Sequence, residues 1–223
     1  MSIKKEYQVF EGLRIATSLT FISGYLNAFT YVTQGGRFAG IQSGNIIMLS
    51  YYLARRDIVQ VVSFLNPIFF FTIGQFVVYM TKRYFGTNKW LWHFCSSLMM
   101  SSFVLFAVMI SPFVGPFLTM AILAFVASIQ IGTFQKLRGA PYANVMMTGN
   151  LKNAAYLWFK GWMENDPVLR KRGQETILIL ISFSTGVIVS TLLSIQFSEY
   201  SLAYVLLPAL YVNYELWKEK SLA

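Results

Sequence analysis

Charged side chains are scarce in this chain of 223 residues: Asp, Glu, Lys and Arg make up only 12% of it, whereas 56% is hydrophobic. A soluble domain carries about 25% charged residues, so the composition argues against a water-soluble globule. Four long stretches lack charge entirely, namely 15–36, 58–81, 90–135 and 176–198. Each is long enough for at least one spanning helix, which needs about 20 mostly apolar residues. The sequence therefore predicts a polytopic, all-α membrane protein.

Cysteine and histidine are almost absent as well, with one of each, Cys95 and His93. A single cysteine excludes an internal disulfide and a cysteine metal cluster. A single cysteine and a single histidine also argue against a metal site or a Cys–His nucleophile. The 18 basic residues lie at the ends of apolar runs and form no single patch, which argues against nucleic acid as a partner. We therefore expect no metal, no cofactor, no nucleic-acid partner and no enzymatic activity.

Hydropathy divides the chain into six full-length segments and two short ones. The six are 13–32, 61–80, 90–110, 117–137, 176–195 and 202–217. The prolines and glycine of 111–116 predict a tight turn, which makes the third and fourth segments a transmembrane hairpin. The short segments, 41–54 and 145–159, look helical, yet each begins with polar residues.

The positions of Lys and Arg favour six crossings over eight. If neither short segment crosses and the N-terminus is cytoplasmic, only Arg37, Arg55 and Arg56 of the 18 basic residues lie outside. If both cross, roughly 11 lie inside and 7 outside. Cytoplasmic loops are enriched in Lys and Arg, so we expect six spans, with eight as the alternative and both termini cytoplasmic in either case. The run 170–172, Arg-Lys-Arg, is expected to anchor the fifth span or to attract anionic lipid.

The two parts of the chain, 1–111 and 112–223, repeat one order of elements: a span, a short helix and two further spans. A shift of 105 residues, with about seven more near the end, aligns Ser23 with Ser128, Phe29 with Phe134, Ser43-Gly44-Asn45 with Thr148-Gly149-Asn150, and Thr72-Ile73-Gly74 with Ser184-Thr185-Gly186. Because each half has an odd number of spans, the halves must have opposite orientations. Such 3+3 inverted repeats occur in transporters, whose substrate sites lie near the membrane midplane.

Both short helices begin with a hydroxyl residue, glycine and asparagine. The hydroxyl can cap a helix by accepting a hydrogen bond from a free N–H group, and the glycine allows close backbone approach. The asparagine offers both a donor and an acceptor, and a helix N-terminus suits an anion or a carbonyl dipole. The alternative is that the triplets are only caps and close-packing glycines.

Neutral amides are the polar side chains expected inside the membrane, because every Asp and Glu lies in a terminus, a loop or the end of a span. We therefore expect no buried carboxylate, which argues against carboxylate-based proton coupling and favours a facilitator or coupling through neutral oxygens. Some amides are expected only to join helices. These amides are Asn27, Gln42, Asn45, Gln75, Gln130, Asn144 and Asn150.

Three motifs resemble the YoaK family of bacterial membrane proteins of unknown function: Ser23-Gly24-Tyr25-Leu26-Asn27-Ala28, Ile41-Gln42-Ser43-Gly44-Asn45 and Thr148-Gly149. The resemblance covers nearly the whole chain in order and spacing. Family members usually have an acidic residue at the position of Asn27 and a threonine at that of Ser43. Gln130 matches a common glutamine, whereas Ile131-Gly132 replaces an Asn-Ala pair. The resemblance implies a bacterial cell-membrane location and supplies no activity.

The sequence thus predicts a transporter or channel-like facilitator for a small polar solute or ion. Its midplane site would be formed by the paired triplets, with Asn27 and Gln130 beside them. The alternative is a non-transporting scaffold, sensor or partner subunit whose polar motifs only hold helices together. Six spans from 223 residues make a small bundle, for which a homodimer is an open expectation.

Overall fold

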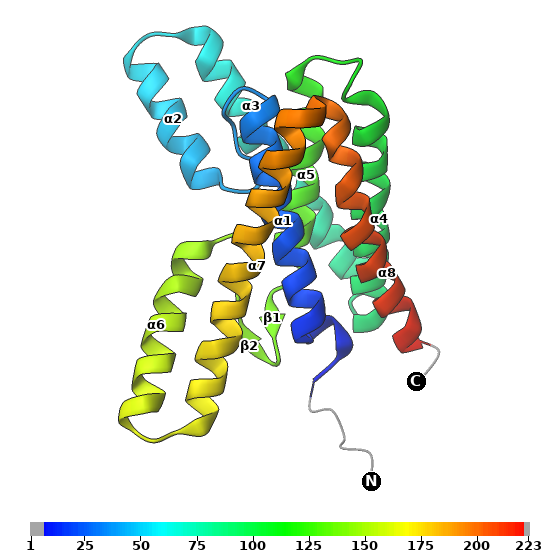
Figure 1. Cartoon of the computed structure of the whole chain (residues 1–223). Coiled ribbons are helices and arrows are strands. Elements are labelled where there is room, and N and C mark those ends of the chain that lie inside the picture. The colour runs from blue at the N-terminus through cyan, green and yellow to red at the C-terminus, as the bar shows by residue number, and fades with distance from the viewer. Residues whose placement is uncertain (1–6, 221–223) are drawn as a thin grey trace.

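The computed structural model describes residues 7–220, which form an all-α bundle with one small β-hairpin (Figure 1). In chain order the elements are η1 (Val9–Glu11), α1 (Leu13–Thr33), α2 (Gln42–Ala54), α3 (Ile58–Phe85), α4 (Lys89–Ile110), α5 (Pro116–Thr133), β1 (Lys136–Leu137), β2 (Ala140–Pro141), α6 (Met147–Met163), α7 (Pro167–Phe197), η2 (Ser198–Val205) and α8 (Leu206–Lys220).

Four helical stretches in the described part of the chain are long and apolar enough to cross a membrane. They are Ile58–Phe85, Lys89–Ile110, Pro116–Thr133 and Pro167–Glu219. The last stretch is interrupted at Ser198, whose φ of 50° ends α7 and begins the 3-10 turn that leads into α8. The predicted span 202–217 therefore begins within that turn.

Helix α1 is not one of these four stretches, and it forms the covered centre of the bundle. Thirteen of its 21 residues are buried, including Thr20, Ser23, Asn27 and Thr30. It packs along α7 and also contacts α5 and α8. Polar side chains are tolerated on such a helix because protein, and not lipid, surrounds them. Helix α5 is similarly central, with 13 of 18 residues buried.

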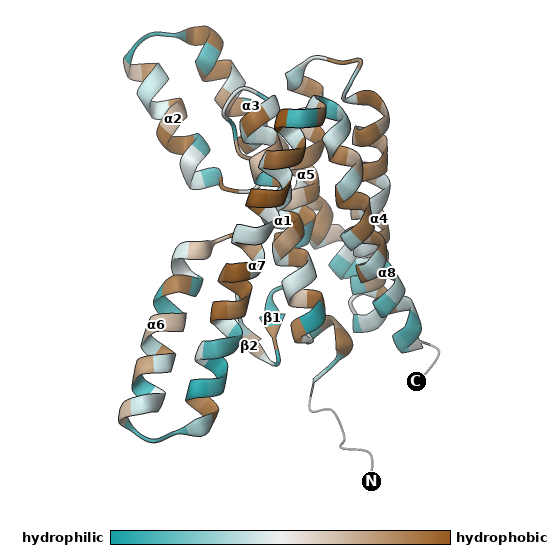
Figure 2. Ribbon diagram, viewed as in Figure 1, coloured by the Kyte–Doolittle hydropathy of each residue, from teal (hydrophilic) through white to brown (hydrophobic). Residues whose placement is uncertain are grey.

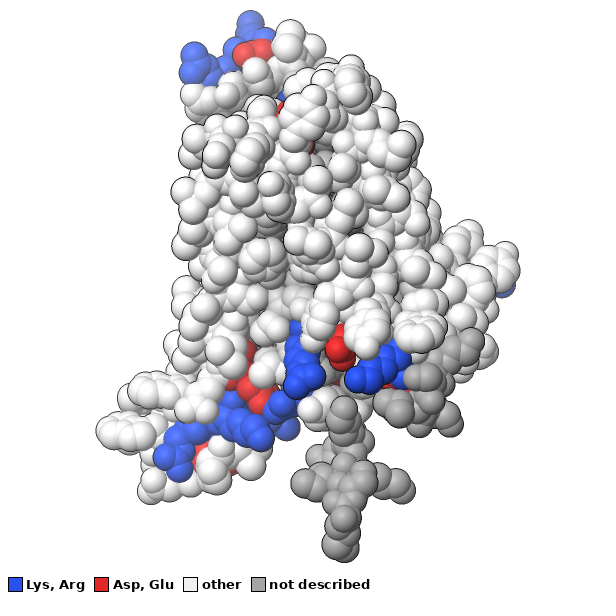
Figure 3. Space-filling model, turned by 45° about the vertical axis from the view of Figure 1, so that its right-hand side comes forward, with Lys and Arg blue, Asp and Glu red and all other residues white. Residues whose placement is uncertain are grey.

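Charge is confined to the two ends of the molecule. Helix α1 begins and α8 ends at the lower end in Figure 1, where the α3–α4 turn, the hairpin and the α6–α7 turn also lie. The α2–α3 turn, with Arg55, Arg56 and Asp57, lies at the upper end. Figure 3 shows a broad face between these ends without charge, and Figure 2 shows the hydrophobic residues concentrated in the same middle region.

Helix α5 ends four residues before the predicted end of the fourth span at Leu137. The N–H of Phe134 donates to Gln130 O (3.1 Å), and the side-chain amide of Asn144 donates to Phe134 O (3.0 Å). Residues 136–141 then form the hairpin, turned by Arg138 (φ 48°) and Gly139 (φ 81°). Two consecutive positive φ angles are typical of the tight turns that connect antiparallel strands.

Reciprocal glycine contacts join α1 to α7. A Cβ added to Gly24 would lie 2.2 Å from the carbonyl oxygen of Phe183, and one added to Gly186 would lie 2.3 Å from that of Phe21. The two backbones therefore touch directly, and neither glycine can carry a side chain.

Helices α3 and α5 meet through a related contact. A Cβ added to Gly74 would lie 2.5 Å from Cβ of Ser128, whose hydroxyl donates to Phe71 O (2.6 Å). Ser128 thus has the same place against Phe71 of α3 that Gly24 has against Phe183 of α7. Gly24 and Ser128 are 104 residues apart, one fewer than the offset that aligns Ser23 with Ser128.

We expect Gly186→Leu to destabilise the fold by about 3 kcal/mol or more, because the new side chain meets a backbone carbonyl that cannot rotate away. Thermal unfolding of the purified protein in detergent measures the loss. Gly115→Ala is the control, since no atom lies within 4 Å of its added Cβ. Equal unfolding temperatures for the two variants would contradict the close contact.

Candidate functional site

The two short helices begin next to each other, midway between the ends of the bundle. Helix α2 rises from this point and α6 descends from it (Figure 1). A Cβ added to Gly40 would lie 2.9 Å from Cγ1 of Val145, so the segments that lead into the two helices are in contact. Their N-cap residues have nearly the same backbone angles: φ −84° and ψ 74° at Ile41, and φ −86° and ψ 82° at Met146.

Asn45 and Asn150 have the same local role, which is to hold the preceding segment against the helix. The side-chain amide of Asn45 donates to Phe38 O (2.7 Å), and its oxygen accepts from Phe38 N (3.0 Å). The amide of Asn150 likewise donates to Ala143 O, seven residues earlier (2.5 Å). Asn45 is fully buried and engaged at both ends of its amide, so it supports the fold and offers no free group to a ligand.

The prediction that Ser43 and Thr148 cap these helices is wrong. The helices begin one residue earlier, at Gln42 and Met147, and neither has a side-chain cap. Ser43 and Thr148 are exposed on the first turn instead.

The two glycines of the triplets have different surroundings. A Cβ on Gly44 would lie 2.9 Å from the ring of Phe38, which indicates close packing, whereas no atom lies within 4 Å of a Cβ on Gly149. The asparagines of the two triplets thus have the same role, whereas the glycines do not.

Asn27 of α1 fixes the start of α2. Its side-chain oxygen accepts hydrogen bonds from Gly40 N (2.9 Å) and Ile41 N (3.2 Å), while its amide nitrogen donates to Ser23 O (2.8 Å). Asn27 therefore holds the two residues that precede α2, while the helix itself has no side-chain cap.

Gln130 joins α5 to α1 close to the same place. Its amide nitrogen donates to Leu19 O (2.8 Å) and to the hydroxyl of Ser23 (2.6 Å). Its own side-chain oxygen, and that of Asn144, are buried without a hydrogen-bond partner in the described structure. A buried acceptor without a donor is costly, and the Tyr142 hydroxyl lies beside Asn144.

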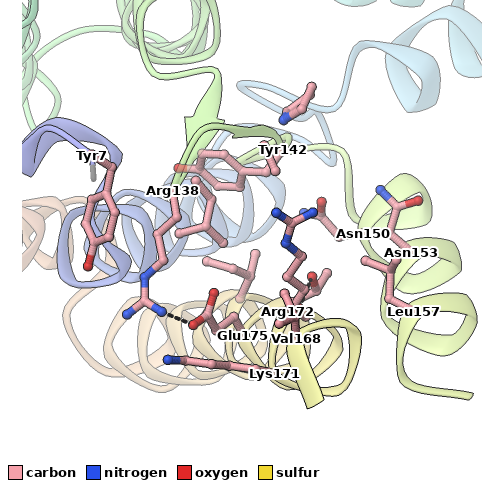
Figure 4. A pocket seen from close by; sticks show the side chains of 15 residues that line it. Tyr7, Arg138, Tyr142, Asn150, Asn153, Leu157, Val168, Lys171, Arg172 and Glu175 are labelled. Carbon is pink, nitrogen blue, oxygen red and sulfur yellow. Dashed lines mark hydrogen bonds and ion pairs between the residues drawn. The ribbon is translucent and has the colours of Figure 1, made fainter. Parts of the chain in front are cut away.

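Two pockets of similar size flank the point where the short helices begin. One, of about 430 Å³, lies between α2 and α3 in the upper half of the molecule and includes Gly44, Tyr52 and Gln60 in its lining. The other, of about 400 Å³, lies between α6, α7 and the hairpin in the lower half and includes Asn150 and Asn153 (Figure 4). The upper pocket has no charged residue in its lining, whereas the lower one has four: Arg138, Lys171, Arg172 and Glu175.

The lower pocket corrects the expectation that no carboxylate is buried. Glu175 is only 7% exposed and forms an ion pair with Arg138. The guanidinium of Arg138 also lies over the ring of Tyr7, 5.3 Å from its centroid. Burial raises the pKa of the Tyr142 phenol, whose oxygen faces Thr20 and Asn144.

The sequence offers only a weak signal for this pocket. The basic run 170–172 can be recognised in the sequence. The hairpin folds back against α7, however, and only this brings together Arg138, Tyr142 and Glu175. Of the eight predicted site residues, the lower pocket includes Asn150 and the upper one includes Gly44. Asn27, Asn45 and Gln130 lie in the interior between them.

The apolar helices and their charge-free middle define the class: an all-α protein of the membrane type. A family model described as "Protein of unknown function (DUF1275)" matches residues 15–213, so the chain belongs to the DUF1275 family. No curated protein and no solved structure matches the chain. The narrower resemblance to YoaK proteins stays a prediction. Because the family description names no activity, the function has to be argued from the geometry.

We expect Asn27→Leu to destabilise the protein by about 1–3 kcal/mol for each N–H group that loses its acceptor. Asn27→Asp keeps an oxygen for Gly40 N and Ile41 N and should lose clearly less stability. Thermal unfolding of both variants tests this difference. If the leucine and aspartate variants unfold at the same temperature, Asn27 does not hold the start of α2.

Proposed function

We propose that this protein is a transporter or channel-like facilitator for a small polar solute, built from two inverted halves that together cross the cell membrane six times. The observation that carries the proposal is that two short helices start side by side in the interior and run towards opposite ends. Transporters with inverted repeats place their substrate sites where such interrupted helices meet. Irregular backbone at that depth requires protein or a water-lined cavity around it, and a pocket lies on each side.

Helix length supports six crossings. The 13 residues of α2 and the 17 of α6 reach about 20 and 26 Å at 1.5 Å per residue, less than the hydrocarbon core of about 30 Å. Each also starts midway between the two ends of the bundle, so each extends through only one half of its height (Figure 1). With the lower, more basic end in the cytoplasm, both termini would be cytoplasmic.

The packing supports a twofold relation between the halves. If α1, α2, α3 and α4 correspond to α5, α6, α7 and α8, the pair α1–α7 corresponds to α5–α3, and the pair α4–α5 to α8–α1. All four of these helix pairs are in contact. Gly40 and Val145 are equivalent at the offset of 105 residues and touch each other, as expected for residues on a twofold axis.

The topology predicts that residues 55 and 171 lie on opposite sides of the membrane. We expect Arg55→Cys to react with an impermeant maleimide added outside intact cells, and Lys171→Cys to react only after lysis. Both variants are made with Cys95→Ser, which removes the one native cysteine. Labelling of both positions from the same side would support eight crossings and refute the inverted arrangement.

Transport predicts that filling either pocket stops flux without unfolding the protein. Asn153→Trp fills part of the lower pocket and Gln60→Trp part of the upper one. Gln196→Trp, exposed on α7 and in neither pocket, is the control. Proteoliposomes are tested for uptake of labelled ions, amino acids, nucleosides and glycerol. We expect at least one solute to enter faster than into empty liposomes, with the flux lost in both pocket variants and kept in the control.

A non-transporting scaffold or partner subunit is the second candidate function. The observation that favours it is the complete engagement of Asn45 and Asn27 in hydrogen bonds within the protein. This function predicts no uptake of any solute above that of empty liposomes. It also predicts that tryptophan in either pocket has no effect beyond stability.

A further inference from the structure

Two cations in the lower pocket have no carboxylate partner. The ion pairs in the described residues are Arg138–Glu175 and Lys160–Glu164. Glu175 is therefore already paired, and neither ion pair includes Lys171 or Arg172. The lining as a whole has three cations and one carboxylate, so the pocket has an excess of positive charge.

The arrangement of the side chains places hydrogen-bond donors around this charge. Figure 4 shows Arg172 reaching from α7 into the pocket towards Tyr142 and Asn150, with Asn153 on the facing turn of α6. The hydroxyl oxygen of Tyr142 is buried and faces Thr20 and Asn144, so Tyr142 lines the pocket but offers it no donor. A guanidinium fork with an additional amide donor matches the oxygens of a phosphate group.

The second half of α6, which forms one wall of the pocket, suits the membrane surface. It has five large apolar side chains that are more than 45% exposed, together with Lys160. These side chains are Tyr156, Trp158, Phe159, Trp162 and Met163. This half lies farthest from the middle of the bundle (Figure 1), and aromatic and basic residues are typical of the level at which a helix reaches the headgroups. The upper pocket, of similar volume, has no charged lining and provides a natural comparison within the same fold.

We propose that the pocket between α6, α7 and the hairpin binds a phosphate-bearing anion, with Lys171 and Arg172 supplying the charge and Asn153 supplying a further donor. Two sources carry this chemistry: the headgroup of an anionic phospholipid and a small soluble phosphate ester. The inference rests on the pocket alone and holds whether or not the protein transports a solute.

The test measures binding to the purified full chain in detergent. The probes are phosphatidylglycerol, phosphatidylcholine and glycerol 3-phosphate, each titrated while the unfolding temperature and the dissociation constant are recorded. We expect phosphatidylglycerol or glycerol 3-phosphate to stabilise the chain. Binding should weaken at least about tenfold in the double variant Lys171→Gln/Arg172→Gln, since each charge-assisted hydrogen bond contributes about that factor or more.

The matched control is Arg55→Gln/Arg56→Gln, which removes the same charge from the opposite end and should change affinity less than about twofold. Arg172→Lys keeps the charge but loses the planar fork, so it should bind with intermediate affinity. If the double glutamine variant does not fold, the affinity of Arg172→Lys tests the proposal in its place.

The probes distinguish the two sources. Binding of phosphatidylglycerol without glycerol 3-phosphate identifies a lipid headgroup site, whereas binding of glycerol 3-phosphate identifies a site for a soluble ester. Three results would overturn the proposal: no binding of either anion, equal binding of phosphatidylcholine, or equal losses in the double variant and its control.

Discussion

Backbone N–H and C=O groups must be paired wherever a chain turns within an apolar environment, and this requirement governs the centre of the molecule. Two segments, 34–41 and 134–146, enter the interior before α2 and α6 begin. Asn27 and Asn45 pair the backbone of the first segment, and Asn144 and Asn150 pair that of the second. The sequence suggests that these amides bind a ligand. In the structure their first role is to pair the backbone, which allows two helices to start inside the bundle.

Close backbone contact then determines which helices surround this centre. The glycine–carbonyl contacts leave no space between α1 and α7, or between the corresponding α3 and α5. Helices α1 and α5 are covered on most sides, so they can include threonine, serine and amide side chains without exposing them to lipid. Lipid-facing apolar surface falls instead to α3, α4 and α7, whose burial is far lower.

The sequence predicted the long helices, because charge-free length depends on local composition. The short helices and the offset of 105 residues at their starts are also visible there, and the N-cap angles of Ile41 and Met146 agree with that offset. The predictions that failed depend on tertiary contacts. Ser43 does not cap α2, and Asn27 holds the residues before this helix, because only the fold brings α1 beside them. Glu175 lies near the end of an apolar run, yet the hairpin covers it and adds Arg138 as its partner.

The helix pairing also divides the molecule differently from the sequence. Helix α7 of the second half packs on α1, and α3 of the first half packs on α5, so each compact unit combines helices from both halves. The units meet along α1–α5 and α4–α8, and at the contact of Gly40 with Val145. Across α1–α5, the side-chain amide of Gln130 donates to Leu19 O and to the hydroxyl of Ser23. Across α4–α8, Asn213 accepts a hydrogen bond from Ser97 (2.5 Å) and donates one to Ser101 (2.8 Å), and the indole N–H of Trp90 donates to Leu216 O (2.7 Å). Side-chain hydrogen bonds therefore join the two units along both helix pairs.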